Sequence, residues 1–299
     1  MIENNQIISL SLKRKLFFRP YSGYGDWISV NGMIRFFSSK YDEVNLIVDG
    51  SDLTFLSNLY KDDIKIKFLY INQIGQITNL NDYLNLEIWE QTKNNHNNNN
   101  FYDRFNPIGK KFEFDVLSID DECYSREESP HNFIRKCRKQ LESNSSAFYI
   151  AAGIPKEYRL DKFYYKRDFE SEDQFFNSLN LPEEYVVICE YGNNLVDRKF
   201  IKNKNTHIIN INNISPKYFD VIKVIENAKE VHLIENSIAL LVYHLQYKNL
   251  MKSVKINMHT YSRKEIIRRC TSPNNSNLYL DMFLYPKLKN WNFIYENEL

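Results

Sequence analysis

The chain has 299 residues, of which 43% are hydrophobic and 15% aromatic, enough apolar material for two packed domains of about 150 residues each. Lys and Arg number 39 against 38 Asp and Glu, and this balance argues against a dedicated nucleic-acid binder. The N-terminal residues lack the charged start and apolar core of a signal peptide, and no apolar stretch is long enough to span a membrane. We therefore expect a cytoplasmic protein without a membrane span.

Alternating strand and helix patterns predict a parallel sheet in the first half of the chain. Residues 15–19 have the pattern of a short buried strand, and residues 20–25 that of a turn-rich loop. A helix is expected over 26–38, because Trp27, Val30, Ile34 and Phe37 recur at helical spacing. Further elements are expected as a strand at 44–48, a helix at 51–60 and a strand at 64–71.

The second half repeats this alternation. Its expected helices are 169–179, 218–227 and 237–246, and its expected strands are 185–190, 206–211, 231–234 and 254–258. Between the halves, a helical stretch is expected at 132–142, and the Asn-rich run 94–100 reads as a solvated loop in which His96 is not a ligand. We predict two Rossmann-like domains, 1–160 and 161–299, facing each other across a cleft in the α/β architecture called GT-B.

Four cysteines occur, at positions 123, 137, 189 and 270, and their spacings match no zinc pattern. Cys189 lies in an apolar run and is expected to be a buried, reduced thiol. The sequence also lacks a DxD motif that would hold Mg²⁺ or Mn²⁺ beside a sugar nucleotide. The adjacent acids at 62–63 and 120–121 read as surface residues, so no metal and no cofactor is expected.

The first candidate site is the loop of Gly23, Tyr24, Gly25 and Asp26, between a strand and a helix start. Glycines let the backbone approach a ligand, and a carboxylate at a helix N-terminus stays ionised and can accept a proton from a hydroxyl. A carboxylate would repel a diphosphate, so the loop suits an acceptor and a general base. Alternatively, the loop is a plain turn in which Asp26 merely caps the helix.

The second candidate site follows the strand at 231–234, where Glu235 precedes Asn236 and Ser237 at the start of a helix. Free N–H groups, the positive end of the helix dipole and the Ser237 hydroxyl would hold a diphosphate. Alternatively, Asn236 or Ser237 simply caps the helix. Glu235 either accepts hydrogen bonds from a ribose or is a solvated surface acid.

Basic and aromatic residues after two other strands could complete this second site. Arg198 could pair bidentately with a pyrophosphate, with Lys199 beside it. After the strand at 254–258, the run from His259 to Arg263 is a further candidate, with His259 counted among the donor-binding residues. Arg263 could reach a phosphate, and Tyr261 could stack on a base or pack in the core. The alternative is that these residues are ordinary surface or core residues.

Two stretches carry a resemblance to a known group. GYGDWISVNGMIRFF at 23–37 is similar to the N-terminal motif of the heptosyltransferase-like GT-B glycosyltransferases, and AKEVHLIENSIALLVYHL at 228–245 resembles a segment of their donor domain. Uncharacterised glycosyltransferase-like proteins of marine bacteria and large DNA viruses have similar counterparts of these and of FYYKRDFESEDQFF, DRKF and HTYSR. A viral origin would place the protein in the host cytoplasm.

The resemblance implies an inverting, metal-independent transfer of a sugar from a nucleoside-diphosphate sugar to a glycan or other hydroxyl acceptor. Asp26 would be the catalytic base, and the nucleoside diphosphate would leave toward Ser237, Arg198 and Arg263. The Glu-Asn-Ser sequence at 235–237 departs from the family's Gly- and Ser/Thr-rich donor loop, which argues against a heptose donor.

The sequence bears on three other functions. A Rossmann dehydrogenase is disfavoured because Ile28 stands where the third glycine of its fingerprint belongs. An NAD-dependent epimerase usually needs a Tyr-x-x-x-Lys pair, and Tyr60, Tyr70 and Tyr243 have no lysine at that spacing. A catalytically inactive GT-B-like module that binds a carbohydrate or a partner stays open.

Overall fold

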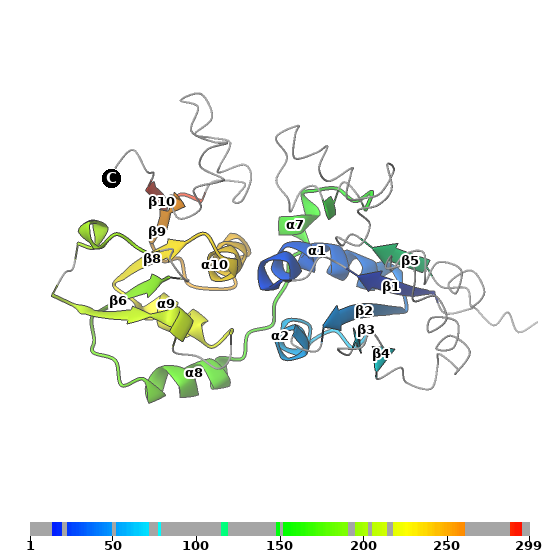
Figure 1. Ribbon diagram of the computed structural model, residues 1–299, viewed down its shortest axis with the longest axis horizontal. Coiled ribbons are helices and arrows are strands. Elements are labelled where there is room, and N and C mark those ends of the chain that lie inside the picture. The colour runs from blue at the N-terminus through cyan, green and yellow to red at the C-terminus, as the bar shows by residue number, and fades with distance from the viewer. Residues whose placement is uncertain are drawn as a thin grey trace, which may run out of the picture.

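The computed structural model describes residues 14–19, 23–49, 52–71, 77–78, 115–118, 148–149, 152–190, 195–202, 205–213, 218–260 and 288–294. These residues contain two five-stranded sheets, which lie side by side in Figure 1. The predictions for 94–100, 132–142, Tyr261 and Arg263, and for three of the four cysteines, fall outside the described residues.

The first sheet has the strand order β4-β3-β2-β1-β5. All its neighbouring strands run parallel except β3 and β4. The strands are β1 (Lys15–Arg19), β2 (Glu43–Asp49), β3 (Ile66–Ile71), β4 (Ile77–Thr78) and β5 (Asp115–Ser118). The helices of this half are α1 (Tyr24–Lys40), α2 (Leu53–Leu59) and α7 (Tyr158–Asp161).

The second sheet has the order β10-β9-β8-β6-β7, and all its strand pairs are parallel. Its strands are β6 (Tyr185–Cys189), β7 (His207–Asn210), β8 (Glu230–Ile234), β9 (Ile256–His259) and β10 (Trp291–Ile294). The helices are α8 (Phe169–Ser178), α9 (Val221–Asn227) and α10 (Ser237–Tyr247), with 3-10 turns η3 (Arg198–Phe200) and η4 (Ile211–Asn213). The predicted α/β class is confirmed, with one sheet fully parallel and the other parallel except for β4.

The central strands of the second sheet are buried on both faces. Every residue of β6 and β8 is buried, including Glu230 and His232 of β8, as expected for central strands of a parallel sheet covered on both faces. One face packs in the main core, and the other packs against a smaller cluster that includes Val196 and Ile201. Cys189, at the end of β6, is a free and buried thiol, as predicted.

The strand orders place one topological switch point in each sheet. In the first sheet β2 and β3 follow β1 on one side, whereas β5 lies on the other side of β1. In the second sheet β7 lies on one side of β6, and β8, β9 and β10 follow on the other. Ligands of open parallel sheets bind at the carboxyl ends of the strands beside such a switch. A ligand site is therefore expected at the residues that follow β1, β6 and β8.

Helix α1 begins earlier than predicted. The expected start was Asp26, but the helix begins at Tyr24, so Tyr24 and Gly25 belong to its first turn instead of the loop. The cause is Gly23, which precedes the helix with a φ of 135°, a conformation that L side chains rarely adopt. Strands β5 and β10 were not predicted at all.

Helix α1 is anchored along its length by α7 and by Tyr149. A Cβ added at Gly32 would overlap the carbonyl oxygen of Tyr158, so only glycine permits this approach. The Tyr149 hydroxyl accepts a hydrogen bond from the Met33 N–H at 2.9 Å and donates one to the Ser29 carbonyl at 3.0 Å. These contacts fix the helix whose first turn carries Asp26.

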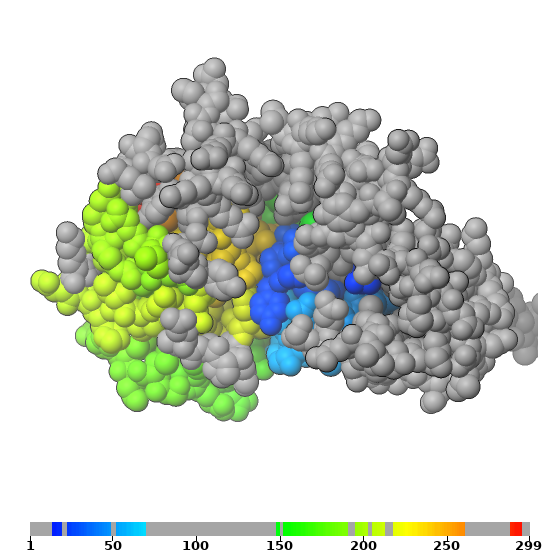
Figure 2. All heavy atoms as spheres, in the orientation of Figure 1, coloured from blue at the N-terminus to red at the C-terminus, as the bar shows by residue number. Residues whose placement is uncertain are grey.

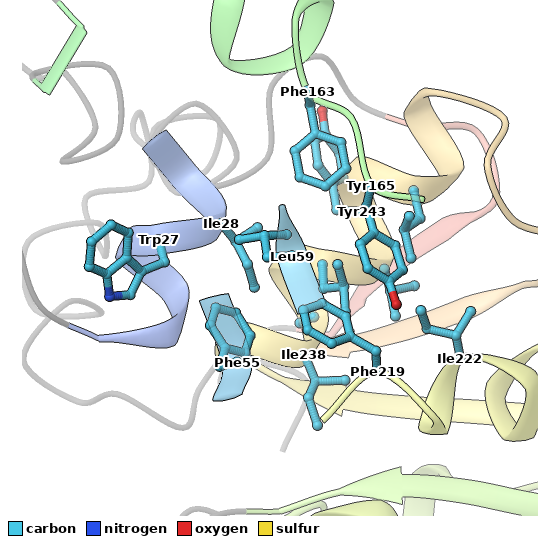
Figure 3. Packing of buried hydrophobic residues seen from close by; sticks show 14 of the residues in the cluster. Trp27, Ile28, Phe55, Leu59, Phe163, Tyr165, Phe219, Ile222, Ile238 and Tyr243 are labelled. Atoms are coloured by element: carbon cyan, nitrogen blue, oxygen red, sulfur yellow. The ribbon is translucent and has the colours of Figure 1, made fainter. Parts of the chain in front are cut away.

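The two sheets share a continuous core. Rings from both halves form what we call the aromatic stack, in the order Tyr24, Phe55, Phe219 and Tyr165. Successive ring centroids are 4.2 Å, 5.1 Å and 4.5 Å apart, and all three pairs are stacked. Figure 3 shows Phe55 and Phe219 facing each other where the two halves meet. The predicted domain boundary between residues 160 and 161 stays a prediction.

Within the described ranges, no helix is both long and apolar enough to cross a membrane.

Candidate functional site

Asp26 lies at the switch point of the first sheet, in the first turn of α1. A Cβ added at Gly23 would lie 2.9 Å from Asp26 Oδ2, so the carboxylate turns back over Gly23. Gly23 is the N-cap residue and Asp26 is the third residue of the helix, a position from which a carboxylate can also support the helix start, so the two interpretations of Asp26 both stay predictions. The half-buried carboxylate sits at the positive end of the helix dipole, which favours its ionised form.

The start of α10 lies at the switch point of the second sheet. Asn236 Oδ1 accepts a hydrogen bond from the Ala239 N–H at 2.9 Å, so Asn236 is the N-cap, as its structural alternative predicted. Ser237 is the first residue of the helix and is half-buried. Glu235 is only 8% exposed, which excludes the alternative of a solvated surface acid.

These two helix starts meet. A Cβ added at Gly25 would lie 3.7 Å from the Cβ of Ser237, an ordinary van der Waals distance. Helices α1 and α10 lie side by side between the sheets (Figure 1). In Figure 2 the blue surface at the start of the chain lies directly against the yellow and gold surface of the second half. The residues predicted for the acceptor side and those predicted for the donor side therefore lie next to each other.

Comparisons with known proteins find similarity among solved structures. No family model and no curated protein matches the chain. The chain is similar to a glycosyl transferase family 9 protein of Veillonella parvula, with 8% identity, a TM-score of 0.49, and coverage of 95% of this chain and 87% of the other. It is also similar to the ADP-heptose LPS heptosyltransferase II of E. coli, with 9% identity, a TM-score of 0.45, and coverage of 95% and 93%.

A polar cluster surrounds the start of α10 at the ends of β6 and β8. Asn236 Nδ2 donates to the Cys189 sulfur at 2.8 Å, and the Cys189 thiol donates to Asn212 Oδ1 at 3.2 Å. Burial raises the pKa of Cys189 to about 12, so the group stays a neutral thiol. Cys189 and Asn212 hold the N-cap in place. Sequence reasoning missed this role, although both residues follow or end strands beside the switch point.

Arg198 and Lys199 form ion pairs with carboxylates close to them in the sequence. Arg198 Nη1 lies 2.9 Å from Glu190 Oε1, and the same carboxylate oxygen accepts the Val196 N–H at 2.8 Å. Lys199 Nζ lies 3.6 Å from Asp197 Oδ2. The described partners of these two residues are carboxylates of the protein, and their phosphate contacts stay a prediction.

His259 is fully buried in a hydrogen-bonded chain with His232 and Glu230. His232 Nε2 lies 2.8 Å from Glu230 Oε1, and His232 Nδ1 lies 2.8 Å from His259 Nε2. A carboxylate only accepts, so we assign the proton of His232 to Nε2, and His259 Nε2 must then donate to His232 Nδ1. The predicted donor-binding role of His259 therefore cannot use its Nε2 atom.

The hydrogen-bonded histidines His232 and His259 make the free energy of unfolding depend on pH. Burial lowers the pKa of His259 to about 3, so His259 is neutral in the folded protein at pH 5–7, and it also lowers the pKa of His232, whereas an unfolded histidine titrates near 6.5. Unfolding then takes up protons below about pH 6.5, and each such histidine removes about 1.4 kcal/mol of unfolding free energy per pH unit. We expect denaturant titrations from pH 7 to 5 to show this loss. His259→Gln should flatten the dependence by about one proton, and an unchanged slope would contradict the assignment.

The acids at 62–63 are not solvated surface residues, contrary to the sequence prediction. Asp62 accepts two hydrogen bonds from Arg35, at 2.9 Å and 2.8 Å, and Asp63 accepts one from Ser38 at 2.6 Å. They fix the end of α1 to the turn after α2. Among the described residues, no group of three or more His, Cys, Asp or Glu could hold a metal ion.

Two other tyrosines, Tyr158 and Tyr285, do have a lysine at the Tyr-x-x-x-Lys spacing. The described pair is Tyr158 with Lys162, whose ammonium lies 5.4 Å from the centre of the Tyr158 ring. Tyr158 packs by its carbonyl against Gly32, in the middle of α1. This pair therefore belongs to neither helix start of the candidate site.

Proposed function

We propose that the chain is a GT-B glycosyltransferase that moves a sugar from a nucleoside-diphosphate sugar to a hydroxyl acceptor with inversion. The observation that supports this most is the contact between Gly25 and Ser237. It brings a helix-start carboxylate at the first switch point beside a helix N-terminus at the second. A base next to an anion-holding helix start is what such a transfer needs.

In the proposed reaction, Asp26 accepts the proton of the acceptor hydroxyl. The hydroxyl oxygen forms a bond to the anomeric carbon, while the bond from that carbon to the diphosphate oxygen breaks. The electron pair leaves with the diphosphate, whose growing charge is stabilised by the N–H groups of α10 and the Ser237 hydroxyl. In this reaction the protein itself supplies the base and the groups that stabilise the leaving diphosphate, without a metal ion. We expect the enzyme to act in the cytoplasm.

A module that binds a nucleotide sugar or glycan without transfer is the second candidate. It is favoured by the ion pairs of Arg198 with Glu190 and of Lys199 with Asp197. Because Arg198 and Lys199 are paired with carboxylates, the described donor side could stabilise a departing diphosphate through the dipole of α10 but not through an unpaired guanidinium. Turnover of a bound nucleotide sugar would decide between the two candidates.

The proposal is tested by a thermal-shift and calorimetry panel of ADP, UDP, GDP, CDP and inorganic pyrophosphate. We expect one nucleotide to be favoured, and at a hundred times its dissociation constant to raise the unfolding free energy by about 2.7 kcal/mol. Sugar nucleotides of that base are then assayed for transfer and hydrolysis. A flat panel, pyrophosphate included, would contradict the proposal.

Asn236→Asp is the matched variant for this panel. Asn and Asp cap helices about equally, but Asp loses the hydrogen bond that Asn236 Nδ2 donates to the Cys189 sulfur, so we expect a loss of stability of about 1 kcal/mol. The new carboxylate lies at the start of α10, and we expect it to weaken pyrophosphate binding about tenfold through repulsion. Unchanged affinity would place the diphosphate elsewhere.

A further inference from the structure

Tyr218 lies where the two halves meet, in the segment before α9. Its ring stands edge-on to Tyr24 at 5.3 Å and to Phe55 at 5.0 Å, two members of the aromatic stack from the first half. It is also edge-on to Phe219 at 5.4 Å. Three neighbouring rings fix the direction of the side chain, so its hydroxyl has a defined position.

The hydroxyl of Tyr218 is buried and has no hydrogen-bond partner among the described residues. Its neighbours are the Ser237 hydroxyl, the Cys189 thiol and Tyr24. The Ser237 side chain lies close enough to lower the pKa of Tyr218, yet the pair does not reach hydrogen-bond geometry. Two hydroxyls therefore flank the start of α10 without satisfying each other.

An unsatisfied buried hydroxyl is unfavourable by about 1–3 kcal/mol, so its presence calls for an explanation. The same half shows the usual solution, since the Tyr185 hydroxyl donates to the Val224 carbonyl at 2.7 Å. Burial raises the pKa of Tyr218 well above its usual value, so the group keeps its proton. It can therefore donate a hydrogen bond to an anion without losing the proton to it.

We infer that the Tyr218 hydroxyl, together with Ser237, donates a hydrogen bond to a phosphate oxygen bound at the start of α10. This inference rests on the proposed function and adds a residue to its donor side. As the bond from the anomeric carbon to the diphosphate breaks, the electron pair goes to the diphosphate oxygen. Tyr218 stabilises that charge by hydrogen bonding, and the only proton transferred goes from the acceptor to Asp26.

Tyr218→Phe tests the inference, because it removes the hydroxyl and keeps the three ring contacts. Hydrogen bonds to charged groups contribute about 1.5–3 kcal/mol, so we expect the dissociation constant for inorganic pyrophosphate to rise about 10- to 100-fold. The denaturant midpoint should stay the same or rise, since no internal hydrogen bond is lost. Calorimetry and urea unfolding of the full chain measure the two effects.

Tyr185→Phe is the control, because it deletes a satisfied hydroxyl in the same half. We expect it to lower stability and to leave pyrophosphate affinity unchanged. If Tyr218→Phe binds pyrophosphate as tightly as the wild type, or loses as much stability as Tyr185→Phe with no change in affinity, the inference is wrong and the proposed function stands. If the wild type binds neither pyrophosphate nor any nucleoside diphosphate, both are wrong.

Discussion

Asp26→Asn is expected to lower the rate of glycosyl transfer about 100- to 10,000-fold, the range that a general base contributes. The amide cannot accept the acceptor's proton at neutral pH, whereas its size preserves the packing over Gly23. Binding of the diphosphate to the start of α10 should not weaken, because the substitution removes a negative charge from the neighbouring helix. Transfer is measured with the sugar nucleotide that the panel selects, and affinity by calorimetry.

Asp52→Asn provides the matched control in the same half. Asp52 precedes α2 and accepts a hydrogen bond from Trp27 Nε1 at 3.1 Å, which the Asn side-chain oxygen can also accept. We expect this variant to transfer sugar within a few-fold of the wild type. Full transfer by Asp26→Asn, or equal losses in the two variants, would remove Asp26 from the mechanism.

Gly32→Ala is expected to destabilise the protein by about 3 kcal/mol or more. Helix propensity alone would favour alanine by about 1 kcal/mol. The clash decides the sign, because the new methyl group would overlap the Tyr158 carbonyl and come within 3.1 Å of the Tyr149 hydroxyl. Because the Tyr158 carbonyl belongs to the backbone, α1 and α7 would have to separate to make room for the methyl group.

Gly153→Ala distinguishes a clash from a general intolerance of glycine replacement. Gly153 has a φ of 68°, and nothing lies within 4 Å of an added Cβ. Only the left-handed conformation then opposes alanine, by about 1–2 kcal/mol. Urea unfolding should show a larger loss of unfolding free energy for Gly32→Ala than for Gly153→Ala. If Gly32→Ala loses less than Gly153→Ala, α7 does not pack on α1 as described.

The sequence was sufficient to predict most elements of both sheets, since apolar runs and helical spacing are local signals. It also placed Asp26 and Ser237 at helix starts, because glycines and polar residues after a buried strand mark such junctions. The early start of α1 was missed, since it depends on the φ of Gly23. Strands β5 and β10 are four residues each, and their assignment depends on pairing with β1 and β9.

Other contacts of the candidate site could not be read from the sequence. His259 was placed among the donor-binding residues, and the register that pairs it with Ile234 sets it on the same face of the sheet as His232. Arg198 was predicted to contact a pyrophosphate, and its ion pair with Glu190 depends on how the loop folds back. Tyr218 looked like part of a helix, and its place beside Ser237 depends on how the two halves meet. Such proximities are set by tertiary structure and leave no local pattern.

The aromatic stack has a consequence for how the molecule comes apart. Tyr24 and Phe55 belong to one half, Phe219 belongs to the other, and Tyr165 lies on the segment that connects them. Unfolding of either half would remove the stacking partners of the rings in the other half and expose those rings to water. We therefore expect heat or urea to unfold the chain in one cooperative transition, and a polypeptide cut near residue 160 to yield fragments prone to aggregation.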